Sequence, residues 1–212
     1  FVTMGDSQRW YDETEDFVKE INKRNDIDFV IHGGDMSDFG LTKEFLWQRD
    51  IMNGLNVPYV VLIGNHDCLG TGAETYKAVF GPTNFSFIAG NVKFVCLNTN
   101  ALEYDYSEPV PNFTFMEQEI TSRLDEFEKT VISMHARPYT DVFNDNVAKV
   151  FQHYIRQYPG IQVCTAAHTH HYQDDVIFDD GIHYVTSDCM DYRTYLVFTI
   201  TPEKYEYELV KY

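Results

Sequence analysis

The chain has 212 residues and a formal net charge of −17 at pH 7, from 16 Lys and Arg against 33 Asp and Glu. Its length predicts a single domain over residues 1–212 with a sizeable apolar core. The acidity argues against nucleic acid as a partner, because proteins bind a nucleic-acid backbone through basic patches. A small phosphorylated substrate remains compatible with it, because bound cations invert the charge of a pocket.

The sequence leaves the compartment and the oligomeric state open. No apolar run approaches the ~20 residues that cross a bilayer, so we expect a soluble protein without a membrane span. The chain opens at Phe1 in an apparent strand and without an initiator Met. This indicates either an exported chain whose leader was removed or a trimmed cytoplasmic one. Four widely spaced cysteines predict neither a disulfide scaffold nor a zinc–thiolate site.

The first third of the chain alternates strands with helices, as judged from the spacing of its apolar residues. The expected elements are a strand at 1–4, a helix at 12–24, a strand at 28–31, a helix capped by Thr42 and running through Ile51, and a strand at 57–63. The last strand is almost wholly apolar, which is typical of a sheet covered on both faces. The alternation predicts right-handed crossovers and a parallel sheet.

The rest of the chain is expected to contain a hairpin around Ala89-Gly90-Asn91, two helices and a C-terminal antiparallel meander. The expected elements are strands at 85–88 and 92–97, helices at 113–128 and 146–158, strands at 131–134 and 161–166, and meander strands at 176–178, 182–186, 195–201 and 205–210. Residues 100–112, which include Tyr104 and Tyr106, lack periodicity and are expected to form a packed surface loop near the mouth of the site, the alternative being that these rings stack on a base or sugar of a substrate. The complete set of expected elements predicts two β-sheets packed together with helices on their outer faces.

Polar side chains follow five of the expected strands directly. In chain order they are Asp6 and Gln8, Asp35, Asn65 and His66, His135, and His168 and His170. Each signal alone is weak, since an isolated Asp after a strand is usually a turn cap. Together they are informative, because the carboxyl ends of parallel strands meet at one sheet edge. Gathering so many polar groups is costly without counter-charges, so the order predicts two adjacent divalent metal ions.

In this order the motifs resemble the calcineurin-like metallophosphoesterase superfamily, over nearly the whole chain. The resemblance implies a four-layer αββα sandwich of the α/β and α+β classes, with two mixed sheets flanked by helices. It implies a dinuclear centre of manganese, iron, zinc or magnesium, whose ligands divide into two sets. One metal would be held by Asp6, Gln8, Asp35 and His170, and the other by Asp35, Asn65, His135 and His168, with Asp35 bridging.

The resemblance also implies the reaction, which is hydrolysis of a phosphoric monoester or diester by a hydroxide that bridges the two metals. His66 would face the scissile ester without binding metal, and would protonate the leaving oxygen. Asp38 would hydrogen-bond His66 and thereby set its tautomer and basicity. Phe39 stands where Ser/Thr protein phosphatases have Arg, and the Tyr of purple acid phosphatases is missing, so both subfamilies are disfavoured.

Two residues depart from the family pattern, namely Gln8 where His is usual and Ala167 where Gly is usual. Gln offers a neutral oxygen, so the first metal is expected to bind more weakly or to be a harder ion. The alternative function is therefore a catalytically weakened phosphoesterase-like binding module with one metal site filled. The presence of both His66 and Asp38 argues against it, because a pure binding module has no use for that pair.

Two arginines are candidates for substrate binding, because each follows a metal motif closely. Arg9 and Arg137 are each within reach of a phosphate oxygen in such an arrangement, in the best case through two hydrogen bonds. A surface ion pair is an equally good interpretation of each. The natural substrate is not indicated by the sequence.

Overall fold

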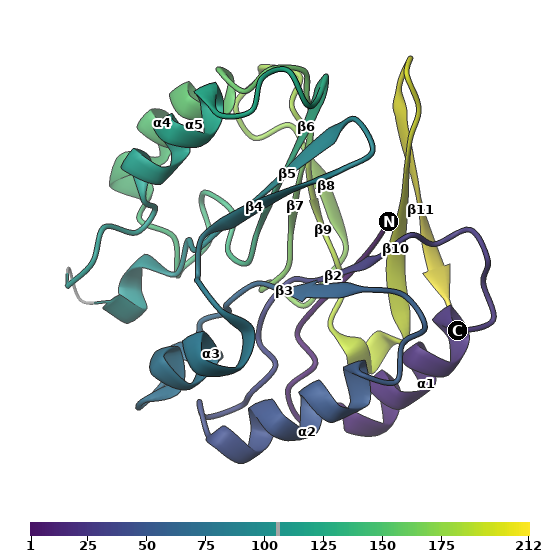
Figure 1. Ribbon diagram of the computed structural model, residues 1–212. Coiled ribbons are helices and arrows are strands. Elements are labelled where there is room, and N and C mark those ends of the chain that lie inside the picture. The colour runs from purple at the N-terminus through teal and green to yellow at the C-terminus, as the bar shows by residue number, and fades with distance from the viewer. Residues whose placement is uncertain (105–106) are drawn as a thin grey trace.

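Two β-sheets pack face to face in the computed structural model, which describes residues 1–104 and 107–212 (Figure 1). The first sheet has the order β11-β10-β1-β2-β3. Its strands are β1 (Val2–Met4), β2 (Val30–His32), β3 (Tyr59–Val61), β10 (Thr194–Ile200) and β11 (Tyr205–Lys211). β1, β2 and β3 are parallel, and β10 and β11 form an antiparallel hairpin that joins β1.

The second sheet has the order β4-β5-β6-β7-β9-β8. Its strands are β4 (Phe85–Ala89), β5 (Val92–Leu97), β6 (Lys129–Met134), β7 (Ile161–Ala166), β8 (Gln173–Asp175) and β9 (Tyr184–Thr186). The four inner strands are parallel, and the edge strands β4 and β8 are antiparallel to their neighbours. Both sheets are therefore mixed.

Helices cover the outer face of each sheet, and this gives the four-layer αββα sandwich that was expected (Figure 1). The first sheet is covered by α1 (Tyr11–Ile21), α2 (Thr42–Met52) and α3 (Gly72–Phe80), and the second by α4 (Phe113–Thr121) and α5 (Ala148–Ile155). In α1, the buried residues Phe17, Val18 and Ile21 recur at helical spacing and pack on the sheet. None of the helices in the described ranges has the length and apolar content of a bilayer crossing.

A third apolar cluster fills the space between the two sheets, and it combines aliphatic side chains with stacked aromatic rings. The Phe1 ring stacks on Phe198 with a centroid distance of 5.1 Å and meets Phe94 edge-on at 5.0 Å. Leu196 and Phe198 of β10 point into this cluster, whereas Tyr195 and Val197 point toward the helices over the first sheet. Because strands of this kind are covered on both faces, they carry apolar residues at consecutive positions.

The C-terminal segment departs from the predicted meander, since its strands are divided between the two sheets. β9 lies parallel to β7, whereas β10 and β11 belong to the first sheet. Residues 176–178 are not a strand, because Phe178 is buried against the α5 layer and the edge pairing is made instead by β8. A short apolar run cannot by itself distinguish a strand from a loop that covers the core.

Several helix ends also differ from the predictions. Thr42 is the first helical residue rather than the cap, and the Leu41 N–H at that end donates to the Glu44 carboxylate at 3.2 Å. α5 begins at Ala148, after a 3₁₀ turn. α4 ends at Thr121, seven residues earlier than the predicted 128. This end of α4 contacts the buried Lys93 side chain.

Lys93 of β5 is fully buried and binds the C-terminal end of α4. Its Nζ donates to the carbonyl oxygens of Glu119 and Ser122, at 2.5 and 3.1 Å, and lies 2.9 Å from the Glu119 carboxylate. A cation at this end of a helix is favourable because the last carbonyl groups carry partial negative charge. Lys93 thus links the second sheet to the helix layer above it.

Replacing Lys93 with Met is expected to lower the free energy of unfolding by about 3–5 kcal/mol, because it removes the closer and buried of the two cations that pair with the Glu119 carboxylate, the other being Arg123. Urea denaturation followed by circular dichroism measures this change. The control is the double variant Lys93→Met/Glu119→Gln, which removes both charges and should recover part of the loss. Equal stability of Lys93→Met and the wild type would contradict the assigned role.

Candidate metal centre

The predicted metal ligands lie together at the carboxyl ends of strands from both sheets. Asp6 follows β1, Asp35 follows β2 and Asn65 follows β3, all in the first sheet. His135 follows β6, and His168 follows β7, in the second sheet. The structure therefore brings together five segments that are far apart in the sequence, and the carboxyl edges of the two sheets meet at this point.

The first group of ligand atoms contains Asp6, Asp35 and His170, with one ligand atom of each lying within 4.8 Å of the others. The Asp6 carboxylate is fully buried, and its Oδ1 is 3.6 Å from His170 Nε2. Gln8 joins this group, because its Nε2 lies 3.4 Å from Asp35 Oδ2. The oxygen atoms Asp6 Oδ1 and Gln8 Oε1 are buried and have no hydrogen-bond partner among the described residues. Two buried acceptors that lack a hydrogen-bond donor in the described part of the chain match the oxygen ligands of a cation site.

The second group contains Asn65, His135 and His168, and it shares Asp35 with the first. Asn65 Oδ1 lies 2.9 Å from His135 Nε2 and 3.0 Å from His168 Nδ1. His135 Nε2 is also 3.5 Å from Asp35 Oδ2. On the other side of its ring, His135 Nδ1 donates to the Gly33 carbonyl oxygen at 2.8 Å, so Nε2, which faces the other candidate ligands, is the atom that would bind a metal.

The charge balance of the site favours bound cations. Asp6, Asp35 and Asp67 are almost fully buried, and no Lys or Arg of residues 1–104 and 107–212 forms an ion pair with them. Burial raises the pKa of Asp6 to about 7, an effect that His135 opposes and the Asp35 charge reinforces. Burial alone would lower the pKa of His135, but Asp35 outweighs it and raises this pKa to about 9. Buried carboxylates of this kind are stabilised by paired charges or by metal ions.

Four of the predicted ligands have a left-handed backbone conformation. The φ angles are 51° at Asp6, 57° at Asp35, 75° at His168 and 61° at His170. This conformation is uncommon for residues other than glycine, and it concentrates at functional sites where the surrounding structure enforces it. Here it turns each side chain back toward the sheet edge at the point where the strand ends.

Three glycines, Gly5, Gly33 and Gly64, allow close packing around the candidate site. A Cβ on Gly64 would lie 2.1 Å from Asp35 Oδ1, so any side chain there would displace this carboxylate. Ala167, the residue that departs from the family pattern, has its methyl group 2.9 Å from where a Cβ on Gly5 or Gly33 would lie. The absence of side chains at Gly5 and Gly33 therefore accommodates Ala167.

His66 lies at the edge of the site, and its ring is about one-third exposed. Its Nδ1 is 2.8 Å from the Asp38 carbonyl oxygen. Because a carbonyl can only accept, Nδ1 carries a proton and Nε2 is the atom available to a ligand. The predicted partner, the Asp38 carboxylate, lies 3.6 Å from Nδ1 and instead pairs with Arg9. The tautomer of His66 is thus set by the backbone of Asp38 and not by its side chain.

The two candidate substrate-binding arginines are placed differently. Arg9 is largely exposed beside the site, and its bond to Asp38 raises its pKa. Arg137 is mostly buried, and its Nη2 donates to Gln173 and Asp175 of β8 at 2.9 Å each. Arg137 therefore forms an ion pair with the edge strand, from a more buried position than a surface ion pair would have, and its role in substrate binding stays a prediction. Of the predicted loop aromatics, Tyr104 is buried, and Tyr106 lies outside the described residues.

Two carboxylates that the sequence did not single out support the candidate ligands. Asp67 is fully buried and accepts hydrogen bonds from the backbone N–H groups of Asp35, Ser37 and Gly64, at 2.8 to 2.9 Å. It thereby fixes the loop that carries Asp35. Asp141 lies 2.6 Å from His168 Nε2, and their bond lowers the pKa of Asp141. A carboxylate on the outer nitrogen of a histidine ligand orients the ring and raises its basicity.

Replacing Asp67 with Asn is expected to weaken metal binding by about 10–100-fold, the range typical of residues that orient ligands. The Asn side chain would place an N–H group against backbone N–H donors and shift the Asp35 loop. Isothermal titration calorimetry of the metal-depleted variant measures the effect. An affinity equal to that of the wild type would show that this loop holds its shape without the Asp67 carboxylate.

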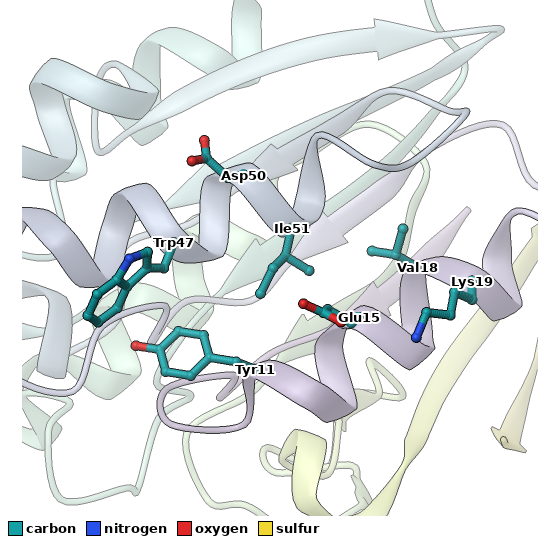
Figure 2. A pocket seen from close by; sticks show the side chains of 7 residues that line it. All are labelled: Tyr11, Glu15, Val18, Lys19, Trp47, Asp50 and Ile51. Atoms are coloured by element: carbon teal, nitrogen blue, oxygen red, sulfur yellow. The ribbon is translucent and has the colours of Figure 1, made fainter.

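A pocket of about 660 Å³ lies away from the candidate metal centre, in a groove between α1 and α2 (Figure 2). Tyr11 and Trp47 meet edge-to-face across it, with ring centroids 5.8 Å apart. Glu15 and Asp50 lie along the same groove. It contains none of the predicted ligands or catalytic residues, so it is separate from the candidate metal centre.

Comparison with known protein families agrees with the geometry. The model of the calcineurin-like phosphoesterase family matches residues 1–172. The chain belongs to this family. The phosphoesterase fold that was predicted from the order of the motifs is therefore confirmed, and family members typically bind two divalent metals. Comparison of this phosphoesterase with curated proteins yields no match.

Solved structures similar to this phosphoesterase share its fold at low sequence identity. A dimetal phosphatase from Danio rerio superposes with a TM-score of 0.77 at 11% identity, over 100% of this chain and 96% of the other. The protein TT1561 of Thermus thermophilus gives 0.65 at 13% identity, over 98% and 96%. Phosphopantetheinyl hydrolase from Mycobacterium tuberculosis gives 0.58 at 11% identity, over 90% and 89%.

Proposed function

We propose that this protein hydrolyses phosphoric esters at a dinuclear metal centre. The observation that carries the proposal is the position of Asp35, whose carboxylate is shared by the two groups of ligand atoms. A shared carboxylate holds two cations side by side, as two-metal phosphoryl-transfer sites require. When bound, the ions would neutralise the phosphoryl oxygens and make water nucleophilic at neutral pH. Membership of the phosphoesterase family supports the reaction class.

The ligand sets follow from the two groups of atoms. Asp6, Gln8, Asp35 and His170 would hold one ion, and Asp35, Asn65, His135 and His168 would hold the other. The buried and unpartnered oxygens of Asp6 and Gln8 support the first set. The shared contact of His135 and His168 with Asn65 Oδ1 supports the second. All of these donors are oxygen or nitrogen atoms, which suits manganese, iron, zinc or magnesium.

His66 is the proposed acid for the leaving oxygen. Its Nδ1 is bonded to the Asp38 carbonyl, so a proton delivered to the ester comes from Nε2. The Asp38 carboxylate, 3.6 Å from Nδ1, would stabilise the protonated ring by its charge. Arg9 also pairs with the Asp38 carboxylate, which therefore interacts with both Arg9 and His66. Arg9 remains a proposed contact for a phosphate oxygen.

The test is a metal titration of metal-depleted protein with two substrates, an aryl phosphate and the corresponding bis-aryl diester. Hydrolysis that requires metal, with two ions bound per chain by elemental analysis, is the expected result. Turnover of the diester would indicate a phosphodiesterase, and turnover of the monoester alone a phosphatase. One bound ion and no hydrolysis with any of the four metals would replace the proposal with the binding-module alternative.

A further inference from the structure

A cleft of about 470 Å³ opens directly beside the candidate metal centre. Gln8, His66 and His170 line its inner side, so a ligand in the cleft would reach the metal-binding atoms and the proposed acid together. The volume is within the range of small-molecule sites. The space next to the proposed centre is thus where the organic part of an ester would lie.

Aromatic side chains form the outer walls of this cleft. Trp10, His171 and Tyr192 all line it. The Tyr192 ring, although 46% of this residue is exposed, is held against His171 at a centroid distance of 5.6 Å. Trp10 has part of its surface packed on the apolar cluster under α1, so its ring has support from behind. Exposed aromatic rings that line a cleft are suited to stacking on a planar ligand.

The position of Tyr192 is tied to the metal-binding loop. The segment that carries it bonds to that loop twice, through a bridge between Gly5 and Cys189 and through the Met190 N–H, which donates to the Asp6 carbonyl oxygen at 3.4 Å. Tyr192 ends the 3₁₀ turn that follows Cys189. A ring stacked on Tyr192 would therefore have a defined position relative to the proposed centre.

The charged residues of the cleft limit the charge of a ligand ring that binds there. The cation lining it, Arg9, is paired with Asp38, and the exposed carboxylate of Asp191 also lines it. A second anionic group on the ligand would meet Asp191 without an unpaired cation to compensate. The cleft thus favours an uncharged planar ring joined to a single phosphoric ester.

We propose that this cleft, through Tyr192 and Trp10, selects phosphoric esters whose alcohol carries an uncharged planar ring, such as nucleoside monophosphates. This inference rests on the proposed function, since the ester group must lie at the metal centre. It assigns the substrate class to a surface outside the proposed metal ligands. Stacking of a base on an aromatic side chain corresponds to roughly 5- to 150-fold in affinity.

The test compares adenosine 5′-monophosphate with ribose 5-phosphate, which has the same phosphate on the same primary alcohol of the sugar but no planar base. The expected kcat/KM ratio is roughly 5 or more in the wild type. In Tyr192→Ala the ratio should fall toward one, and in Tyr192→Phe it should be retained because the ring remains. Trp47→Ala, an exposed aromatic of the separate α1–α2 groove (Figure 2), is the matched control and should keep the wild-type ratio. A wild-type ratio near one, or a high ratio unaffected by Tyr192→Ala, would overturn the inference.

A binding measurement separates failure of the cleft from failure of the proposed reaction. The chain has two tryptophans, Trp10 and Trp47, so the variant Trp47→Phe reports on Trp10 alone. Adenosine monophosphate mixed rapidly with this metal-loaded variant should quench its fluorescence before turnover, and ribose 5-phosphate should not. If neither ester is hydrolysed with any metal, the proposed function fails, and the quenching alone tests whether the cleft binds a planar ring. Equal quenching by both compounds would contradict ring binding in the cleft.

Discussion

Replacing Asp35 with Asn is expected to lower kcat/KM for phosphoric esters by at least ~10³-fold. The carboxylate is the point at which the two groups of ligand atoms meet. A neutral amide would hold at most one ion by its oxygen, and metal-ion stabilisation of the transition state contributes several kcal/mol, each ~1.36 kcal/mol being tenfold in rate. Elemental analysis should find fewer bound ions than in the wild type.

The matched control for this prediction is Asp50→Asn on α2. Asp50 is an exposed carboxylate that pairs with Arg49, so the same chemical change is made away from the sheet edge. Wild-type turnover and metal content are expected for it. If Asp35→Asn kept two bound ions and full turnover, the bridging role of Asp35 would have to be abandoned.

Replacing His66 with Gln is expected to slow hydrolysis of an alkyl phosphate by ~10²–10⁴-fold, which is the usual contribution of a general acid. The effect should be much smaller with a nitrophenyl phosphate, because that leaving group needs no proton. Comparing kcat for the two esters in the wild type and the variant measures the difference. Metal content is expected to stay the same, since His66 is not among the proposed ligands. Undiminished turnover of the alkyl phosphate would remove His66 from its role.

Much of the site could be predicted because its residues stand at strand ends. An apolar run followed by Asp, Asn or His is visible in the sequence, and parallel strands bring such ends to one edge. Asp6, Asp35 and Asn65 were located in this way, and the structure brings them together with the histidines. Their roles as metal ligands, like the single-domain assignment, remain predictions.

The supporting residues could not be predicted, because their contacts leave no local pattern. Asp67 acts on backbone N–H groups, which nearly every residue carries. Asp141 belongs to a turn without periodicity and meets His168 only through the fold. The partner of His66 was predicted as a carboxylate, and the structure shows a carbonyl, which sequence does not encode. The strands after β7 were likewise assigned to one meander, because strand pairing depends on distant partners.

The proposed metal ligands come from both β-sheets, and this has a consequence for stability. Asp6 and Asp35 extend from one sheet, whereas His135 and His168 extend from the other. An ion bound by residues of both sheets would cross-link them, and its binding energy would stabilise their packing against each other. Removal of the metal by a chelator should therefore weaken this packing first at the carboxyl edge of the sheets. The amide hydrogens at the ends of β6 and β7 are expected to exchange faster there.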